Sequence, residues 1–125
     1  MILYFSGTGN SLAISRQLAE RLGEQVMPLN LAVKRDLSQE RRIGFVFPCY
    51  WFNAPRAVTD LLSRLRLPND AYVFIVIPCG AQAGNAIWTV RRFILGHLFE
   101  EKKDLVRSFL FLCPPVHNKR VFPPL

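Results

Sequence analysis

The sequence is poor in cysteine and has no long apolar run. Its three cysteines are Cys49, Cys79 and Cys113, an odd number without a C-x-x-C pair. The chain therefore holds neither a disulfide framework nor an iron–sulfur cluster bound by four of its own cysteines. The most apolar stretch, Ala71–Cys79, is far shorter than the about 20 residues that cross a bilayer. The Met1–Phe5 run lacks the length and the basic flank of a signal peptide. We expect a cytoplasmic protein with reduced thiols.

Charge is sparse as well. Charged residues make up 20% of the 125 residues and hydrophobic residues 50%, which excludes a disordered chain. The net charge of +7 raises the question of a nucleic-acid or membrane-surface partner. The basic residues are scattered pairs without interleaved aromatic residues, unlike a base-stacking platform: Lys34–Arg35, Arg41–Arg42, Arg91–Arg92, Lys102–Lys103 and Lys119–Arg120. A solvated basic surface that steers an acidic redox partner explains the charge better than nucleic acid or membrane does.

What the chain does contain is a series of apolar runs of strand length. They are Ile2–Phe5, Val26–Leu29, Ile43–Phe47 and Tyr72–Ile77, with Ser108–Leu112 as a candidate fifth. Continuous rather than alternating runs predict strands that are buried on both faces, as in a parallel sheet covered by helices.

Helical patterns separate most of these runs. An amphipathic stretch extends to Leu22, and Gly23 follows in the C′ position that ends many helices. Apolar residues recur at helical spacing over residues 57–65, and a further helix is expected from about Asn85 to Leu95. A polar connection, Leu31–Glu40, follows the second run. The alternation of strands and helices predicts a doubly wound α/β fold.

Residues 1–112 are expected to form one domain, and residues 113–125 a proline-rich irregular tail. Pro114–Pro115 and Pro123–Pro124 would interrupt any regular element there.

In such a fold, ligands bind beyond the carboxyl ends of the strands. The loops expected there are Ser6–Ser11, Pro48–Pro55 and Pro78–Asn85, which are also the loops richest in glycine, hydroxyl and aromatic residues. This agreement between topology and composition is the strongest indication of a ligand site.

The loop Ser6–Ser11 has the features of a phosphate site. It lies between a strand and a helix, so that backbone N–H groups and the helix dipole favour an anion there. Gly7 and Gly9 allow the backbone to wrap closely, and four polar side chains add donors. Because the loop lacks lysine, it suits a tightly held monophosphate. The competing interpretation is an ordinary helix N-cap after a glycine turn.

Spacing excludes other phosphate sites. A Walker loop requires lysine where Asn10 stands, and a dinucleotide fingerprint requires glycine where Leu12 stands. Cys49 and Arg56 are separated by prolines and aromatic residues, which does not fit a phosphatase loop.

Three sequence motifs together resemble a known family. SGTGNS (Ser6–Ser11) resembles the FMN phosphate loop of flavodoxins. With FPCYWFNAP (Phe47–Pro55) and CGAQAGNA (Cys79–Ala86), the chain most resembles the flavodoxin half of bacterial flavodoxin–ferredoxin fusion proteins, from Met1 to about Leu95. The ferredoxin cysteine motifs are not in this sequence. The resemblance implies a three-layer sandwich with a parallel sheet of order 2-1-3-4-5 and bound FMN. The helix that normally follows the fifth strand is missing from the pattern.

The resemblance also implies a set of cofactor-binding residues. The phosphate would be held by Ser6, Gly7, Thr8, Gly9, Asn10 and Ser11. One side of the isoalloxazine ring would be flanked by Pro48, Tyr50, Trp51, Phe52 and Asn53. Its other edge would be approached by Cys79, Gly80, Gly84 and Asn85. The family often has glycine near Asn53, where a peptide flips towards flavin N5; asparagine tolerates that backbone at a higher cost.

The function expected from the sequence is FMN-binding electron transfer, as a carrier or as an FMN-dependent oxidoreductase. No catalytic acid or base and no metal ligand is assigned, because protein groups tune a flavin rather than transfer its electrons. The alternative is a shortened non-redox module that binds a partner protein or an anion without flavin. Expected partners are a redox protein, for example an iron–sulfur protein, and a second copy of the chain docked on an incompletely covered sheet face.

Overall fold

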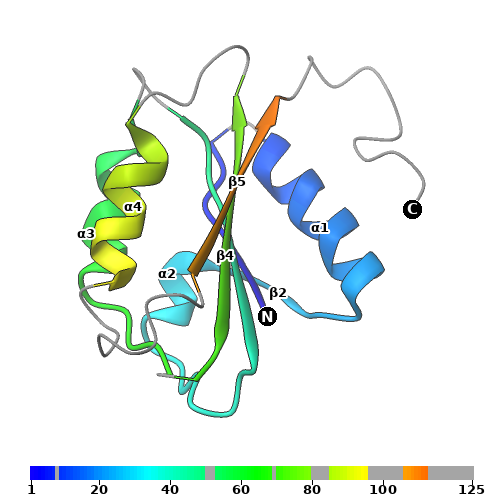
Figure 1. The fold of residues 1–125 in the computed structure, drawn as a ribbon. Coiled ribbons are helices and arrows are strands. Elements are labelled where there is room, and N and C mark those ends of the chain that lie inside the picture. The colour runs from blue at the N-terminus through cyan, green and yellow to red at the C-terminus, as the bar shows by residue number, and fades with distance from the viewer. Residues whose placement is uncertain (8, 50–52, 69, 80–84, 96–105, 113–125) are drawn as a thin grey trace.

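A parallel sheet runs through the centre of the molecule, with helices on both faces (Figure 1). The computed structural model describes residues 1–7, 9–49, 53–68, 70–79, 85–95 and 106–112. The strands are β1 (Ile2–Tyr4), β2 (Val26–Pro28), β3 (Arg42–Val46), β4 (Tyr72–Cys79) and β5 (Val106–Leu112). Their order in the sheet is β2-β1-β3-β4-β5, and every pairing is parallel, which confirms the predicted fold class and order.

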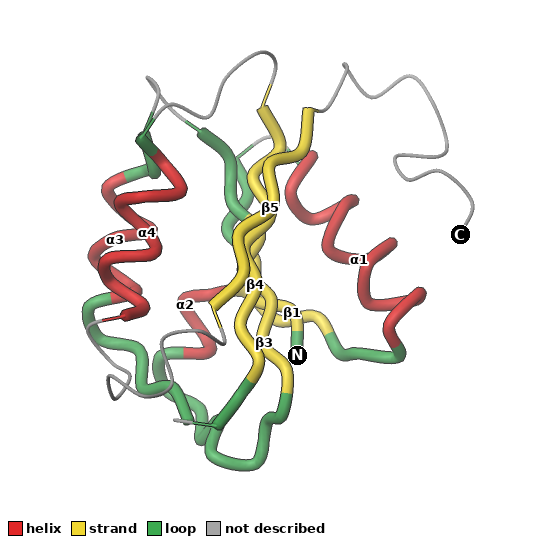
Figure 2. The backbone as a smooth tube through the Cα atoms, viewed as in Figure 1, coloured by secondary structure: helices red, strands yellow, loops and turns green. Residues whose placement is uncertain are grey.

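The helices divide unequally between the two faces of the sheet. Helix α1 (Asn10–Leu22) covers one face, and α2 (Leu29–Ala32), α3 (Arg56–Leu62) and α4 (Ala86–Leu95) cover the other (Figures 1 and 2). The step from β1 to β2 runs towards one side of the sheet, and the step from β3 to β4 runs towards the other. Right-handed crossovers therefore place α1 and α3 on opposite faces.

Each central strand contributes side chains to two cores. On β3, Ile43 and Phe45 belong to the larger core beneath α2, α3 and α4, whereas Val46 belongs to the smaller core beneath α1. On β4, residues 73, 75 and 77 face the larger core and residues 74 and 76 the smaller one. All of these residues are at most 5% exposed. Burial on both faces is what the continuous apolar runs predict.

The smaller core contains a close approach between neighbouring strands. Gly44 of β3 pairs in register with Phe74 of β4. A Cβ atom at Gly44 would lie 2.9 Å or less from three atoms of the Phe74 ring. Because Gly44 has no side chain, the Phe74 ring fills the space that a Cβ atom would occupy.

The end of α1 follows the predicted pattern. Gly23 adopts a left-handed conformation, with φ of 66°, and its N–H donates to the carbonyl of Ala19. The N–H of Glu24 donates to the same carbonyl at 2.9 Å. Glycine reaches this conformation without the cost that a Cβ imposes, which confirms its C′ role.

An ion-pair network ties Glu24, two residues after the end of α1, to the beginnings of β1 and β3. Arg42 Nε donates to Glu24 Oε1 at 2.9 Å, and the Met1 ammonium also pairs with Glu24. The Met1 ammonium further donates to the Arg42 carbonyl at 2.9 Å and lies 3.5 Å from Glu40 Oε2. Burial alone would raise the pKa of Glu24, but the hydrogen bonds and charges of Met1 and Arg42 hold that pKa below its ordinary value of 4.5.

Two predictions about local structure were wrong. The expected polar connection after β2 begins with α2, a four-residue helix too short to show a hydrophobic period. Leu65 has helical spacing in the sequence, yet it lies beyond the end of α3 and is buried in the larger core by the turn that follows. The expected boundary after residue 112 and the proline-rich tail lie outside the described residues. None of the helices in the described ranges has the length and apolar character needed to cross a membrane.

Candidate functional site

The three loops selected from the sequence begin at one edge of the sheet. Because all strands are parallel, the carboxyl ends of β1, β3 and β4 point the same way. Hydrogen bonds continue the pairing at this edge: Phe5 N–H donates to the Val46 carbonyl at 2.9 Å, and Phe47 N–H donates to the Val76 carbonyl at 3.4 Å, while β4 extends further, to Cys79. The loops after the three strands consequently start side by side.

The chain reverses its direction across the sheet between β1 and β3. From β1 the chain crosses to β2 on one side, and from β2 it returns to β3 on the other side of β1. Loops that leave neighbouring strands towards opposite faces open a crevice between them. The position that the topology favours for a ligand is therefore between the Ser6–Ser11 loop and the loop that begins at Pro48.

The loop after β1 forms a tight turn. Gly9 N–H donates to Ser6 Oγ at 2.9 Å, which closes the turn. Gly9 has φ of 95°, a left-handed backbone conformation that residues other than glycine rarely adopt. No atom lies within 4 Å of the position that a Cβ at Gly9 would occupy, so the backbone is open on that side.

Helix α1 begins at this turn with Gly9 as its N-cap residue and without a side-chain cap from the described residues. The first helical hydrogen bond runs from Ala13 N–H to the Gly9 carbonyl at 3.0 Å, so the N–H groups of residues 10–12 have no acceptor within the helix. Gly9 at the N-cap position offers no side-chain acceptor. The described residues therefore supply no side-chain cap for α1, and Gly9 itself occupies the N-cap position after the turn.

Two buried serines near this helix terminus differ in their hydrogen bonding. Ser15 is fully buried, and its hydroxyl donates to the Ser11 carbonyl at 2.7 Å. Ser11 is 2% exposed, and its own hydroxyl makes no hydrogen bond within the part of the chain that the structure describes. A buried hydroxyl without a partner is costly, and it marks a position where a ligand could supply one.

The electrostatics of this edge favour an anion. Helices α1, α3 and α4 all begin here, and none has an acidic residue in its first turn. The partial positive charge at each helix N-terminus is therefore not neutralised by a carboxylate of that turn.

The other two loops are described in part. Pro48 is half-buried, and Cys49 packs partly buried against the larger core. Asn53 is exposed, and its Oδ1 accepts a hydrogen bond from the N–H of Ala54 at 2.9 Å. Asn85 is exposed just before α4, and its carbonyl accepts the Thr89 N–H at 2.9 Å.

The structure describes little or nothing of the remaining predicted site residues. Cys79 is the last residue of β4, paired in register with Leu112, and only its backbone is described. Six of the predicted site residues lie outside the described ranges: Thr8, Tyr50, Trp51, Phe52, Gly80 and Gly84. The structure thus brings together the described residues at positions 6, 7, 9–11, 48, 53, 79 and 85 on one edge of the sheet.

Two further residues lie at this edge: Arg56, which the sequence suggested only for a phosphatase loop that its spacing excludes, and Trp88, which the sequence did not single out. Arg56 is the exposed first residue of α3, and Trp88 is 70% exposed in the first turn of α4. The signal for Trp88 was present in the sequence: Ala86, Val90 and Ile94 recur at intervals of four and form the buried stripe of α4. A tryptophan two residues after Ala86 falls on the opposite side of the helix.

Several solved structures have a similar architecture. The flavodoxin of Megasphaera elsdenii in its two-electron reduced form superimposes with a TM-score of 0.61 at 18% identity, covering 96% of this chain and 90% of that chain. A flavodoxin from the domain Archaea gives 0.60 at 12% identity, with coverages of 91% and 84%. The Trp repressor binding protein of Bacillus subtilis gives 0.64 at 14% identity, with coverages of 90% and 83%. No family profile and no curated protein sequence matches the chain.

These likenesses, at identities of 18% and below, establish the fold and not the activity. The chain has a flavodoxin-like fold.

Proposed function

We propose that the protein binds FMN at the carboxyl ends of β1 and β3 and acts as an electron-transfer flavoprotein. The observation that carries the proposal is the N-terminus of α1, where the N–H groups of residues 10–12 and the buried Ser11 hydroxyl have no hydrogen-bond partner among the described residues, next to the glycine turn. The flavodoxin-like fold supports the same conclusion, since two of the similar structures are flavodoxins. The redox partner, the resemblance to a fusion protein and a cytoplasmic location remain parts of the proposal.

The described residues fit a phosphate monoester better than a larger phosphate chain. The turn donates backbone N–H groups and hydroxyls, and it contains no lysine to balance additional charge. Ser6 holds the turn closed through Gly9, while the N–H groups of residues 10–12 are left to bind oxygen atoms. The Ser11 hydroxyl would donate to one of those oxygens.

The protein's part in the chemistry is to bind and orient. When bound, FMN supplies one- and two-electron redox chemistry. Pro48 and Asn53, with the aromatic residues predicted between them, would flank the ring, and the Ala54 N–H is already held by the Asn53 side chain. Asn85 and the end of β4 would bound the opposite edge of the ring and limit the access of water.

Two serines on one helix provide a sharp test of the phosphate site. Ser11→Ala should weaken FMN binding about tenfold, since a hydrogen bond to a charged group contributes about 1.5 kcal/mol or more. It should not destabilise the apoprotein, because the lost hydroxyl has no described partner. Ser15→Ala is the matched control: its hydroxyl bonds within the helix, so FMN affinity should stay unchanged.

Absorbance and calorimetric titration of the apoprotein with FMN and with riboflavin measure both effects. FMN binding that exceeds riboflavin binding, and that falls only in Ser11→Ala, supports the phosphate site. Equal affinities for Ser11→Ala and Ser15→Ala would place the phosphate elsewhere. A folded protein that binds neither flavin would favour the non-redox module instead.

A further inference from the structure

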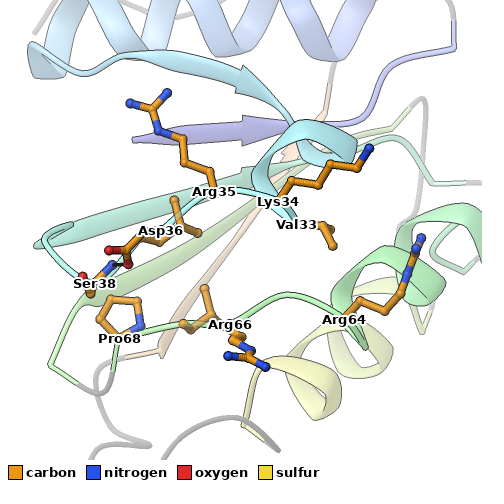
Figure 3. Close-up of a pocket in the computed structure, with 10 residues that line it drawn as sticks. Val33, Lys34, Arg35, Asp36, Ser38, Arg64, Arg66 and Pro68 are labelled. Carbon is orange, nitrogen blue, oxygen red and sulfur yellow. Dashed lines mark hydrogen bonds between the residues drawn. The ribbon is translucent and has the colours of Figure 1, made fainter.

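A second concave surface lies at the opposite end of the sheet from the candidate flavin site. A cavity of about 650 Å³ is formed by Val33–Ser38, which lead from α2 towards β3, and by Arg64 and Arg66–Pro68, which lead from α3 towards β4 (Figure 3). Both segments approach the amino ends of their strands. The cavity is therefore separated from the phosphate turn by the length of the sheet.

The lining of this cavity is strongly basic. It contains Lys34, Arg35, Arg64 and Arg66 but one carboxylate, Asp36. Asp36 is exposed and accepts a hydrogen bond from Ser38 N–H at 2.9 Å, the contact marked in Figure 3. That hydrogen bond lowers the pKa of Asp36, so the carboxylate stays charged but is already bound within its own turn.

Three of the four cations have no structural task in the described fold. Arg64 has one, since its Nε approaches the Asp60 carbonyl near the end of α3 at 3.4 Å. Within the described ranges, Lys34, Arg35 and Arg66 form no ion pair and no side-chain hydrogen bond, and all three are exposed. Like charges gathered without partners repel one another, which destabilises the free protein unless a ligand balances them.

The shape of the cluster distinguishes between classes of anion. Figure 3 shows Arg35 and Lys34 extending in different directions from the end of α2, with Arg66 on the far side of the cavity. In that view the charged ends of Lys34 and Arg35 point away from each other and from Arg66, so they do not converge on one point, as a compact phosphate would require. Between them lie apolar side chains, among which Leu37 is 2% exposed and Val33 and Leu67 are half-buried. Its described lining contains no aromatic residue on which a nucleic-acid base would stack.

We propose that this cavity, lined by Lys34, Arg35 and Arg66 around an apolar floor, is a docking site for an acidic segment of a partner protein. Carboxylates of an extended segment would reach the separate cations, and apolar side chains between them would contact the half-buried Val33 and Leu67. The docking site does not depend on flavin, and its position leaves the opposite edge of the sheet free for electron exchange.

The test measures the binding of a fluorescently labelled peptide of alternating glutamate and leucine to the 125-residue chain. Binding is detected as a rise in the fluorescence anisotropy of the peptide. Binding should weaken as salt is raised, because charge pairs at a rim are screened. Arg66→Glu and Arg35→Glu should each weaken it about five- to tenfold. Arg16→Glu on α1 is the matched control, since it changes the net charge equally at an exposed position on the other face of the sheet.

The expected result is loss of binding in the two cavity variants and retention in Arg16→Glu, with circular dichroism showing that all are folded. Equal losses in all three variants would mean attraction by net charge alone and would overturn the proposal. So would equal binding of a glutamine–leucine peptide, or displacement of the acidic peptide by millimolar inorganic phosphate. Tighter binding of duplex DNA or of phosphatidylserine vesicles that depends on Arg35 and Arg66 would assign the cavity to another class of partner. FMN titration of the same variants should be unchanged, which separates this proposal from that for the flavin site.

Discussion

At the scale of single residues, Gly44 shows how a small side chain on one strand determines what its neighbour can be. The Phe74 ring occupies the volume above Gly44 and closes the smaller core beside α1. Neither residue is remarkable in the sequence. Their relation depends on a cross-strand register between residues 30 positions apart, Gly44 with Phe74, and periodicity along one strand does not contain that information.

We predict that Gly44→Ala destabilises the protein by about 1–3 kcal/mol, because the added methyl group and the Phe74 ring cannot share the same volume. The effect should depend on the ring. In a Phe74→Leu background, Gly44→Ala should cost at least about 1 kcal/mol less, and urea denaturation of the four variants measures the difference as a coupling energy. Strictly additive costs would show that the clash is relieved elsewhere.

At the scale of elements, most of the fold was predictable from the sequence. Strands buried on both faces appear as uninterrupted apolar runs, and the C′ glycine of α1 gave its end correctly. Helix α2 was missed because four residues complete barely one turn. The buried position of Leu65 beyond α3 depends on the path of a turn, which spacing alone does not specify.

Part of the candidate site could likewise be predicted from the sequence, and part could not. That three loops share an edge follows from parallel topology, so the sequence placed the glycine turn and the end of β3 correctly. The sequence did not show which single side chains are exposed or lack a hydrogen-bond partner. The absence of a described partner for the Ser11 hydroxyl, and the exposure of Trp88, depend on packing between elements.

The loop after β3 carries a prediction that fluorescence can check. The chain has two tryptophans, Trp51 in this loop and the exposed Trp88 in α4. Replacing Trp88 with phenylalanine should change stability by no more than about 0.5 kcal/mol. It leaves Trp51 as the remaining emitter, and if Trp51 stacks on the isoalloxazine ring, saturating FMN should quench most of its emission. Unaltered emission at saturation, in a variant that still binds FMN, would contradict that role for Trp51.

At the scale of the whole molecule, the Glu24 network couples stability to pH. The pKa of Glu24 in the folded protein lies below its ordinary value of 4.5. On acidification the unfolded chain therefore takes up the proton first. The stabilisation is complete above about pH 5 and is lost as the pH falls through the folded-state pKa.

Glu24→Gln should accordingly lower the free energy of unfolding by about 1–2 kcal/mol at about pH 7, because Met1 and Arg42 lose their charged partner. The difference from the unmodified protein should shrink at about pH 3.5, as measured by urea denaturation at both values. Glu20→Gln, at an exposed position of α1, serves as the control. A difference that stays constant with pH would mean that the network acts through packing and not through charge.

The short outer strand β2 has a consequence for misassembly. It spans three residues, Val26–Pro28, and ends in a proline, which has no N–H to donate. A foreign strand would find few free backbone groups on that side, whereas β5, the other outer strand, is seven residues long. Extension from one side only cannot propagate, because two molecules joined through β5 each present β2 outward. A pairing of two molecules along β5 would therefore stop at two and would not grow into a fibre.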